Sequence, residues 1–475
     1  MNRFLKAMRD RHPSLFRAMF PLLVRYYGDG AFRLLSKFVT HDHWDCDNDA
    51  ETVLALLYLR GKFNVLPDKV VKHLKLVEVD RTLEGDALLE AAYLDGHFQV
   101  ARALYRKHIV QEPGKVNLGD YVKIIAENNV AVMQTEAELR LFARQRIKRA
   151  ADECVEAMVW RGAPLYHTDE GLSGDDVVRI LGEECDAAPF PMVLELCALR
   201  HEANVPIFLD RAEKVADLCI RFPQYVGYMD FAADETTFHS RKDYRWYLID
   251  AVRAWTVRLA MGLPLVIDTH MGETVQVGDT ERQMLDQIEA LLRKIATDLV
   301  KLATGRSDGK IGLVEGLEKI FGNFSEAERP RFEAAEAQAR SLVAKQGLAM
   351  GVDDGKAMFF SVFLGHGIND LVSDRPRSIC VSSNMYLLPE IGSVDNHSIF
   401  QLFREGKPIT LGPDGLDPLG IVDASQDYTL LWHSKHAFRL PEFKRIAFTA
   451  VRTFNASPAK VARARAAAEK FYGKL

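Results

Sequence analysis

The 475-residue sequence predicts an α/β protein built on a (β/α)8 TIM-type barrel, with additional N-terminal helices and a long helical insertion. Three observations lead to this prediction. About eight short β-rich runs recur along the chain, and long helical patterns separate them. Most of these runs are near-continuous apolar stretches, which is typical of parallel strands that are buried on both faces. Polar clusters close several of the runs, at the strand ends where sites in such barrels lie.

The predicted elements divide the chain into three parts. Residues 1–36 are expected to be helical, 37–456 to form the barrel, and 457–475 to form a terminal helix. A helical excursion of roughly 48–153 separates the first two strands, and an insertion of about 276–357 separates strands five and six. The predicted strands are Lys37–His43, Glu156–Arg161, Met192–Leu199, Tyr225–Phe231, Leu265–Thr269, Phe359–Leu364, Ser378–Ser382 and Ile409–Gly412.

The insertion has helical periodicity of its own. Amphipathic helices are predicted over 280–303, 312–321 and 326–346. Ser325 is a plausible N-cap for the last of them, with Glu328 as its capping-box partner. Because the insertion begins beside the polar cluster after strand five, it is a candidate lid, substrate-selecting wall or oligomer contact.

Charge and composition are those of an ordinary soluble protein. The formal net charge of −5 gives no argument for a nucleic-acid partner. The N-terminal segment is locally basic, which indicates either a solvated helix face or a contact with phosphate or with another subunit. Its basic residues are Arg3, Lys6, Arg9, Arg11, Arg17, Arg25, Arg33 and Lys37.

Cysteine usage and hydropathy favour a cytoplasmic protein. No run approaches the roughly 20 apolar residues that a membrane helix requires, and the arginines and lysines of the first turns argue against a signal peptide. Most cysteines lie within apolar runs and none forms a Cys-x-x-Cys pair, so we expect buried free thiols in a reducing compartment. They are Cys46, Cys154, Cys185, Cys197, Cys219 and Cys380.

A His-x-His pair closes the first predicted strand. His41 and His43 are two residues apart, so on an extended chain both rings can point at one ion. Imidazole suits zinc and related divalent metals. The pair alone is equally compatible with two surface histidines. Asp45 follows on the same face and can contact a polar substrate group such as a ribose hydroxyl, or cap the next helix.

A second cluster follows the fifth predicted strand. His270 comes directly after that strand, and Gly272 permits a sharp turn that can place Glu273 beside a metal without making it a ligand. A glutamate so placed can serve as general acid and base. The alternative is a glutamate in the first turn of the following helix.

Two later clusters complete the series. His366 stands between two glycines after the sixth strand and is a further nitrogen ligand, a base that orients water, or a core histidine. Asp414 ends the eighth strand, where its carboxylate can complete a site of three histidines and one aspartate or simply occupy a turn. Together the clusters predict a metal-dependent hydrolase.

These motifs resemble, in the same order along the chain, those of the adenosine and AMP deaminase branch of the metal-dependent amidohydrolase superfamily. The resemblance spans essentially the whole barrel and the closing helices. The first matching segments are His41-Asp-His-Trp-Asp45 for its His-x-His-Leu-Asp, Tyr228–Glu235 for its Asp-Leu-Ala-Gly-Asp-Glu, and His270-Met-Gly-Glu273 for its His-Ala-Gly-Glu. The later ones are Gly365-His-Gly367 for its Gly-His-Gly, Ser378–Asn384 for its Cys-Pro-x-Ser-Asn, His397–Gly406 with Ile409–Asp414 for its segment ending in Thr-Asp-Asp-Pro, and 427–446 for its closing helices.

The resemblance implies one zinc ion per chain and a hydrolytic deamination of adenine. It implies that His41, His43, His270 and Asp414 bind the zinc, which lowers the pKa of water. The product would be a 6-oxopurine, with release of ammonia.

The resemblance also implies roles for residues around the metal. His366 would orient or deprotonate the attacking water, and Glu273 would protonate the ring nitrogen next to the attacked carbon. Asp45 would face the ribose, and the backbone around Ala233 would approach the purine edge.

The chain departs from the family pattern in the part that recognises the base. The family's paired aspartates become Asp414 and Gly415, and the second aspartate normally binds the purine; either Asp417 replaces it or base recognition differs here. Cys46-Asp47 stands where the family has Gly-Ser or Gly-Ala, and Ala233 replaces a glycine.

We therefore expect a zinc-dependent deaminase acting on a small-molecule adenine nucleoside or nucleotide. The altered recognition residues and the basic N-terminal segment leave a phosphorylated substrate open. The alternatives are another amidohydrolase reaction on a cyclic amide or amidine, and a catalytically inactive barrel that serves as a binding or assembly protein through the 276–357 insertion.

Overall fold

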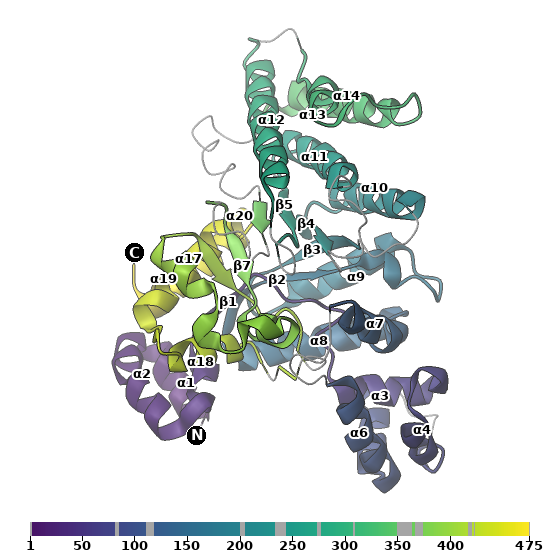
Figure 1. Cartoon of the computed structure of the whole chain (residues 1–475), viewed down its shortest axis with the longest axis vertical. Helices are drawn as coiled ribbons and strands as arrows, with labels where there is room; N and C mark the ends of the chain where they lie inside the picture. The colour runs from purple at the N-terminus through teal and green to yellow at the C-terminus, as the bar shows by residue number, and fades with distance from the viewer. Residues whose placement is uncertain are drawn as a thin grey trace.

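A closed barrel of eight parallel strands, in the order β1 to β8, forms the centre of the molecule (Figure 1). The structure is a computed structural model that describes residues 2–80, 85–110, 118–199, 205–232, 244–272, 277–306, 309–348, 363–365, 374–416, 420–421 and 423–474. Val39 pairs with Leu411 and so closes the barrel between the first and the last strand. The predicted fold class is confirmed.

The strands lie within or close to the predicted runs. Each pairs with its neighbours in parallel, as expected where helices return the chain to the same end of the sheet. They are β1 Lys37–Val39, β2 Val155–Gly162, β3 Met192–Leu199, β4 Val226–Ala232, β5 Val266–Thr269, β6 Phe363–Gly365, β7 Arg377–Ile379 and β8 Ile409–Leu411.

Two predicted strands were too long at their carboxyl ends. The first ends at Val39 rather than at His43, because the chain beyond it pairs only through isolated bridges. The seventh ends at Ile379 rather than at Ser382, because helix α16 already begins at Val381. The buried carboxylate of Asp427 accepts hydrogen bonds from the first backbone N–H groups of that helix, which fixes its start. Residues 359–362 of the sixth predicted strand lie outside the described residues.

Helices surround the barrel and extend it at two places. Those before β2 are α1 Asn2–Arg11, α2 Pro13–Tyr27, α3 Ala50–Leu59, α4 Asp68–Leu74, α5 Gly85–Leu94, α6 Gly96–Ile109, α7 Leu118–Asn128 and α8 Glu136–Asp152. Those after it are α9 Gly174–Ala187, α10 Val205–Arg221, α11 Tyr244–Ala260, α12 Asp279–Ala303, α13 Leu313–Phe321, α14 Arg329–Gln346, α16 Val381–Leu387, α17 Ile399–Arg404, α18 Gln426–His433, α19 Leu440–Thr453 and α20 Pro458–Tyr472.

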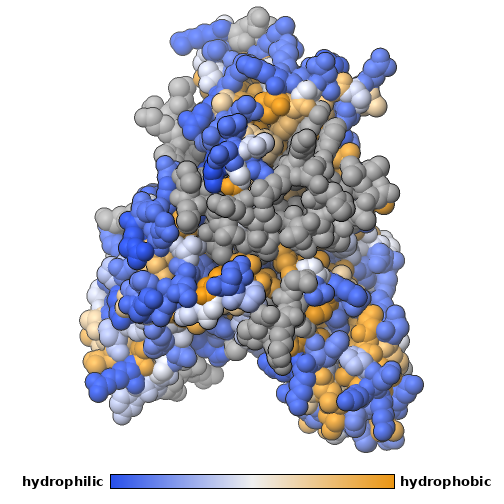
Figure 2. All heavy atoms as spheres, in the orientation of Figure 1, coloured by the Kyte–Doolittle hydropathy of each residue, from blue (hydrophilic) through white to orange (hydrophobic). Residues whose placement is uncertain are grey.

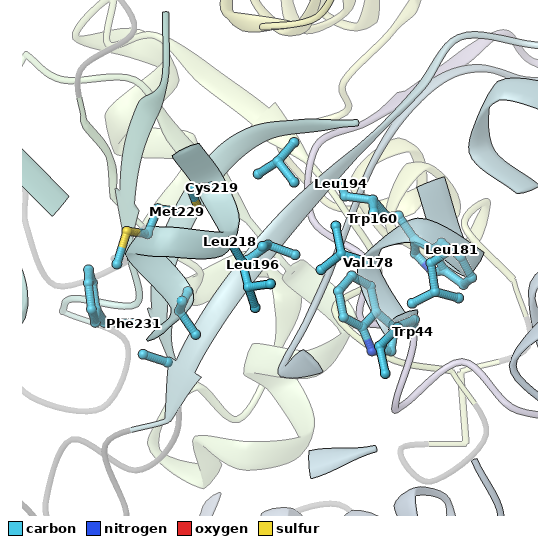
Figure 3. Close-up of a cluster of buried hydrophobic side chains, with 14 of the residues drawn as sticks. Trp44, Trp160, Val178, Leu181, Leu194, Leu196, Leu218, Cys219, Met229 and Phe231 are labelled. Atoms are coloured by element: carbon cyan, nitrogen blue, oxygen red, sulfur yellow. The ribbon is translucent and has the colours of Figure 1, made fainter. Parts of the chain in front are cut away.

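The main apolar core lies between the strands and the helices outside them. Along β3 and β4, alternate residues point outward, and Leu194, Leu196, Met229 and Phe231 pack with side chains of α9 and α10 (Figure 3). The residues between them therefore point into the barrel, where, as shown below, several are charged.

The predicted helices of the insertion are present as α12, α13 and α14. They stack at one end of the molecule, where α12 and α14 pack on the barrel helix α11 (Figure 1). Ser325 and Glu328 exchange the reciprocal hydrogen bonds of a capping box. The helix itself begins only at Arg329, because residues 326–328 form a turn first.

The N-terminal helices cover the end of the barrel at which the strands begin. Lys6 donates to the carbonyl of Ala151, and Arg9 forms an ion pair with Glu156 at the start of β2. Arg17 contacts α20 through the carbonyl of Phe471. These basic side chains are thus engaged within the chain at the end opposite to the carboxyl ends of the strands, which removes the support that they gave to a phosphorylated substrate.

Large apolar side chains are exposed on the described part of the 48–110 region, among them Leu76, Leu94 and Val100. Figure 2 shows apolar side chains gathered over the helices at its lower right, and Leu94 there is 86% exposed. None of the helices in the described part of the chain has the combination of length and apolar character that a membrane crossing needs.

Candidate metal centre and its pocket

Four buried side chains that follow the ends of β1, β5 and β8 converge at the carboxyl end of the barrel. The Nε2 atoms of His41 and His43 lie 3.2 Å apart, those of His43 and His270 3.3 Å apart, and those of His270 and His41 3.1 Å apart. Oδ1 of Asp414 lies 3.2 Å from Nε2 of His41 and 3.4 Å from Nε2 of His43. The donor atoms of all four residues lie within 4.8 Å of one another.

This spacing fits a tetrahedral zinc ion. With bonds of about 2.0–2.1 Å, ligand atoms at the corners of a tetrahedron are about 3.3–3.4 Å apart. The five separations given above, from 3.1 to 3.4 Å, are close to that value, and the sixth, between His270 and Asp414, is within 4.8 Å. Three imidazole nitrogens and one carboxylate oxygen are also donors that zinc prefers. The residues present therefore fit the predicted metal.

The backbone brings Asp414 and the His-x-His segment together. The amide of Asp414 donates to the carbonyl of His41, and the amide of His43 donates to the carbonyl of Asp414. Asp414 adopts a φ of +69°, an unusual conformation for a residue other than glycine and one typical of functional sites. A Cβ atom at Gly412 would lie 2.2 Å from the carbonyl oxygen of His41, so only glycine allows this approach.

A charged layer inside the barrel lies against His270. Oδ2 of Asp230 on β4 lies 2.8 Å from Nδ1 of His270, an ion-pair contact that holds the ring with Nε2 toward the cluster. Arg161 of β2 is fully buried and pairs with Asp230 at 3.4 Å, with Asp268 at 3.0 Å and with Glu195 at 2.9 Å. The guanidinium thus already provides a cation for these three carboxylates, which otherwise have the make-up of a second metal site.

Removing the charge of Asp230 is expected to weaken zinc binding. Asp230→Asn keeps the shape of the side chain but loses the carboxylate that orients His270, and second-layer changes of this kind reduce metal affinity by about 10–100-fold. Competition with a zinc-binding dye measures the affinity directly. The matched control is Asp268→Asn, which removes a carboxylate paired with Arg161 rather than with His270. Equal losses in both variants would contradict the orienting role.

A second buried network holds the His-x-His segment. Asp42, between the two histidines, pairs with Arg146 of α8 at 2.7 Å. Asp47 accepts from the same guanidinium at 3.1 Å and from the indole N–H of Trp160 at 3.2 Å. Asp47, which departs from the family pattern, therefore has a structural partner in Arg146.

Burial sets the protonation states that a metal requires. Desolvation, with the positive charges of His270 and Arg161, holds the pKa of His43 well below its ordinary value, so its ring is neutral and able to bind a metal. Desolvation raises the pKa of Asp414, although a hydrogen bond of 2.6 Å from the Ser383 hydroxyl opposes this. Desolvation also acts on Asp230, but His270 and Arg161 together outweigh it, and the net pKa of Asp230 is well below its usual range.

A largely apolar pocket opens onto the cluster. Its wall comes from one face of α7, within the excursion between the first two strands. The structure thus places a helix of 48–153 beside the site, whereas the described residues of the 276–357 insertion do not line this pocket. The lining residues are His43, Asp45, Cys46, Leu118, Tyr121, Val122, Ile125, Ala126, Val130, Tyr166, Leu199, Ala232, His270 and Asp414.

The predicted substrate contacts are only partly described. Asp45 lines the pocket beside His43, with Oδ1 3.7 Å from Nδ1 of the ring, and desolvation raises its pKa to about 6. The other four predicted residues, Glu273, His366, Ala233 and Asp417, lie outside the described residues, so their roles stay predictions. The sequence did not predict that Tyr121, Asp230 and Arg161 belong to the site.

Solved structures with this fold include an N6-methyl-AMP deaminase and an adenine deaminase. The N6-methyl-AMP deaminase of Arabidopsis superposes with a TM-score of 0.56 at 14% identity, over 92% of this chain and 98% of that one. The adenine deaminase of Arthrobacter aurescens gives 0.52 at 14% identity, over 92% and 99%. An amidohydrolase of Burkholderia ambifaria with bound zinc gives 0.50 at 13% identity, over 94% and 92%.

These likenesses confirm, at the level of fold, the resemblance that the motifs predicted. The chain has the barrel fold of these deaminases over almost its whole length. The sequence itself matches no protein-family profile and no curated protein.

Proposed function

We propose that this protein is a zinc-dependent hydrolytic deaminase that converts an adenine nucleoside or nucleotide to its inosine form and releases ammonia. The observation that carries the proposal is the set of four buried donor atoms at tetrahedral spacing, which faces a pocket at the carboxyl end of the barrel. The fold supports it, since a related Arabidopsis structure is a complex with IMP, a 6-oxopurine nucleotide.

His41, His43, His270 and Asp414 would hold the metal. When bound, zinc lowers the pKa of water and so supplies a nucleophile near neutral pH. The lowered pKa of His43 keeps its ring neutral, and the Ser383 hydroxyl on Oδ2 of Asp414 leaves Oδ1 of that carboxylate on the side of the histidine nitrogens.

Glu273 and His366 would carry out the proton transfers of the reaction. His366 orients the attacking water or accepts its proton, and the water oxygen bonds to the ring carbon that bears the exocyclic amine. Glu273 protonates the adjacent ring nitrogen, so that the carbon accepts the new bond without a charge building up on the ring. The carbon–nitrogen bond to the amine then breaks, and the departing nitrogen takes up a proton and leaves as ammonia.

The pocket would hold the base against its apolar wall. Leu118, Val122 and Ile125 of α7 form a surface suited to the flat face of a purine. Asp45 lies in the same pocket and would receive a ribose hydroxyl, while Ala233 and Asp417 would lie at the edge of the base.

The reducing cytoplasm is the proposed location. All six cysteines are free and buried, as predicted, which is typical of proteins from a reducing compartment.

A substrate screen tests the proposal. The purified protein is incubated with adenosine, AMP, dAMP, ATP and N6-methyl-AMP, and we expect amine or ammonia release with a blue-shifted purine absorbance for at least one of them. Chelation should abolish the reaction and zinc should restore it. Turnover of none of these compounds by zinc-loaded protein would contradict the proposal.

Metal analysis separates this function from a binding protein. A protein that neither contains nor takes up zinc would favour an inactive barrel. Zinc uptake at one ion per chain without adenine turnover would favour a different amidohydrolase reaction on a cyclic amide.

A further inference from the structure

One polar group in the pocket makes no hydrogen bond to the described part of the chain. The hydroxyl of Tyr121 on α7 is buried, with the residue only 4% exposed, and it finds no hydrogen-bond partner among the described residues. The thiol of Cys46, a weak partner at best, lies beside it. An unpaired buried hydroxyl costs free energy, so a group that persists in a ligand pocket is suited to a ligand.

The position of this hydroxyl coincides with the main departure from the family pattern. A Cβ atom at Gly415 would lie 2.5 Å from the Tyr121 hydroxyl oxygen and 2.7 Å from Cβ of Cys46. Tyr121 therefore fills the space in which a side chain at position 415 would begin. The resemblance implies that the aspartate normally found at this position binds the purine, and here such an aspartate would fit only if Tyr121 shifted.

The barrel order indicates which edge of the base Tyr121 faces. Gly415 and Cys46 follow β8 and β1, whereas Glu273 follows β5, which lies across the closed barrel from β1. In adenine, the carbon that bears the amine lies between the ring nitrogen N1 on one side and the edge of the base with N7 on the other side. With Glu273 assigned to N1, the group on the opposite side meets N7.

A phenol suits this contact better than an ionised carboxylate. N7 of adenine is a hydrogen-bond acceptor, and an ionised carboxylate can only accept, whereas a hydroxyl donates. Burial raises the pKa of Tyr121 well above its ordinary value, with Cys46 and Asp414 adding to the effect, so the hydroxyl keeps its proton.

We propose that the hydroxyl of Tyr121 donates a hydrogen bond to N7 of the bound purine and thereby takes over the recognition role of the missing aspartate. This inference rests on the proposed adenine substrate and deepens it. It makes Tyr121 a specificity-determining residue supplied by the helical excursion rather than by a strand end.

The test compares Tyr121→Phe with the wild type on paired ligands that differ only at N7. Purine riboside and its 7-deaza analogue are titrated into each protein by calorimetry, which requires no turnover. We expect the wild type to bind purine riboside roughly 10-fold more tightly than the analogue, and Tyr121→Phe to bind both equally weakly. The preferred substrate and its 7-deaza form should show the same pattern in kcat/KM.

The matched control is Tyr58→Phe, because Tyr58 is another buried tyrosine of the excursion whose hydroxyl bonds a backbone carbonyl outside the pocket. It should keep the N7 preference. A Tyr121→Phe protein that retains the preference would overturn the inference while leaving the deaminase proposal intact. Ligand binding with the expected preference but no turnover would overturn the deaminase alone, and no purine binding by the zinc-loaded wild type would overturn both.

Discussion

Replacing His270 with alanine is expected to leave the purified protein with far less than one zinc ion per chain and without deaminase activity. His270 contributes one of the four donor atoms and is the only one that follows β5, so His41, His43 and Asp414 would then hold the metal from one side. Because changes behind a ligand already cost about 10–100-fold in affinity, loss of the ligand itself should cost more than about 100-fold. Elemental analysis after dialysis measures the zinc content.

The control must separate metal loss from general damage to the fold. His397 is also a buried histidine, 3% exposed against 4% for His270, but it contacts Asn384 and lies outside the cluster. His397→Ala should be destabilised yet retain a full equivalent of zinc. A His270→Ala protein that binds zinc as tightly as the wild type would refute the assigned ligand set.

The barrel and the convergence of the candidate metal ligands were predictable because both leave local signals. Apolar runs bounded by helical patterns mark parallel strands, and polar residues directly after such runs lie at the end of the barrel where they can meet. His41, His270 and Asp414 lie far apart in the sequence, yet each follows its own strand. Their convergence can therefore be predicted without knowing how the loops between the strands run.

The charged layer beneath the candidate metal site was not predictable from the same signals. Glu195 and Asp230 are single acidic residues within otherwise apolar strands, and Arg161 ends a third such run. One charge in an apolar run gives no indication of its partner, because the partners lie on neighbouring strands and pair only after the barrel closes. Their burial at 0% exposure and their mutual ion pairs are consequences of closure.

The wall of the pocket escaped prediction for a related reason. Helix α7 lies in a long excursion whose amphipathic pattern shows that it packs, without showing against what. In the sequence, Tyr121 cannot be distinguished from the other residues on the apolar face of that helix. Only the approach of its hydroxyl to Gly415 relates it to the departure seen at the end of β8.

Replacing Glu273 with glutamine is expected to lower kcat by about 10²–10⁴-fold, the range typical of a lost general acid or base. The amide keeps the size of the side chain but cannot give a proton to the ring nitrogen. Because the four proposed zinc ligands do not include Glu273, the variant should retain one zinc ion per chain and bind the substrate with little change. Single-turnover kinetics with the preferred adenine compound, together with zinc analysis, measure both properties.

Glu281 provides the matched control for this last variant. It is the next glutamate along the chain and is 5% exposed in the first turn of α12, so Glu281→Gln removes a buried carboxylate without touching the proposed proton transfer. Its kcat should stay near that of the wild type. Because proton donation to the ring is the step that makes the carbon electrophilic, near-normal kcat in zinc-loaded Glu273→Gln would show that another group provides the proton, and the mechanism would have to be assigned anew.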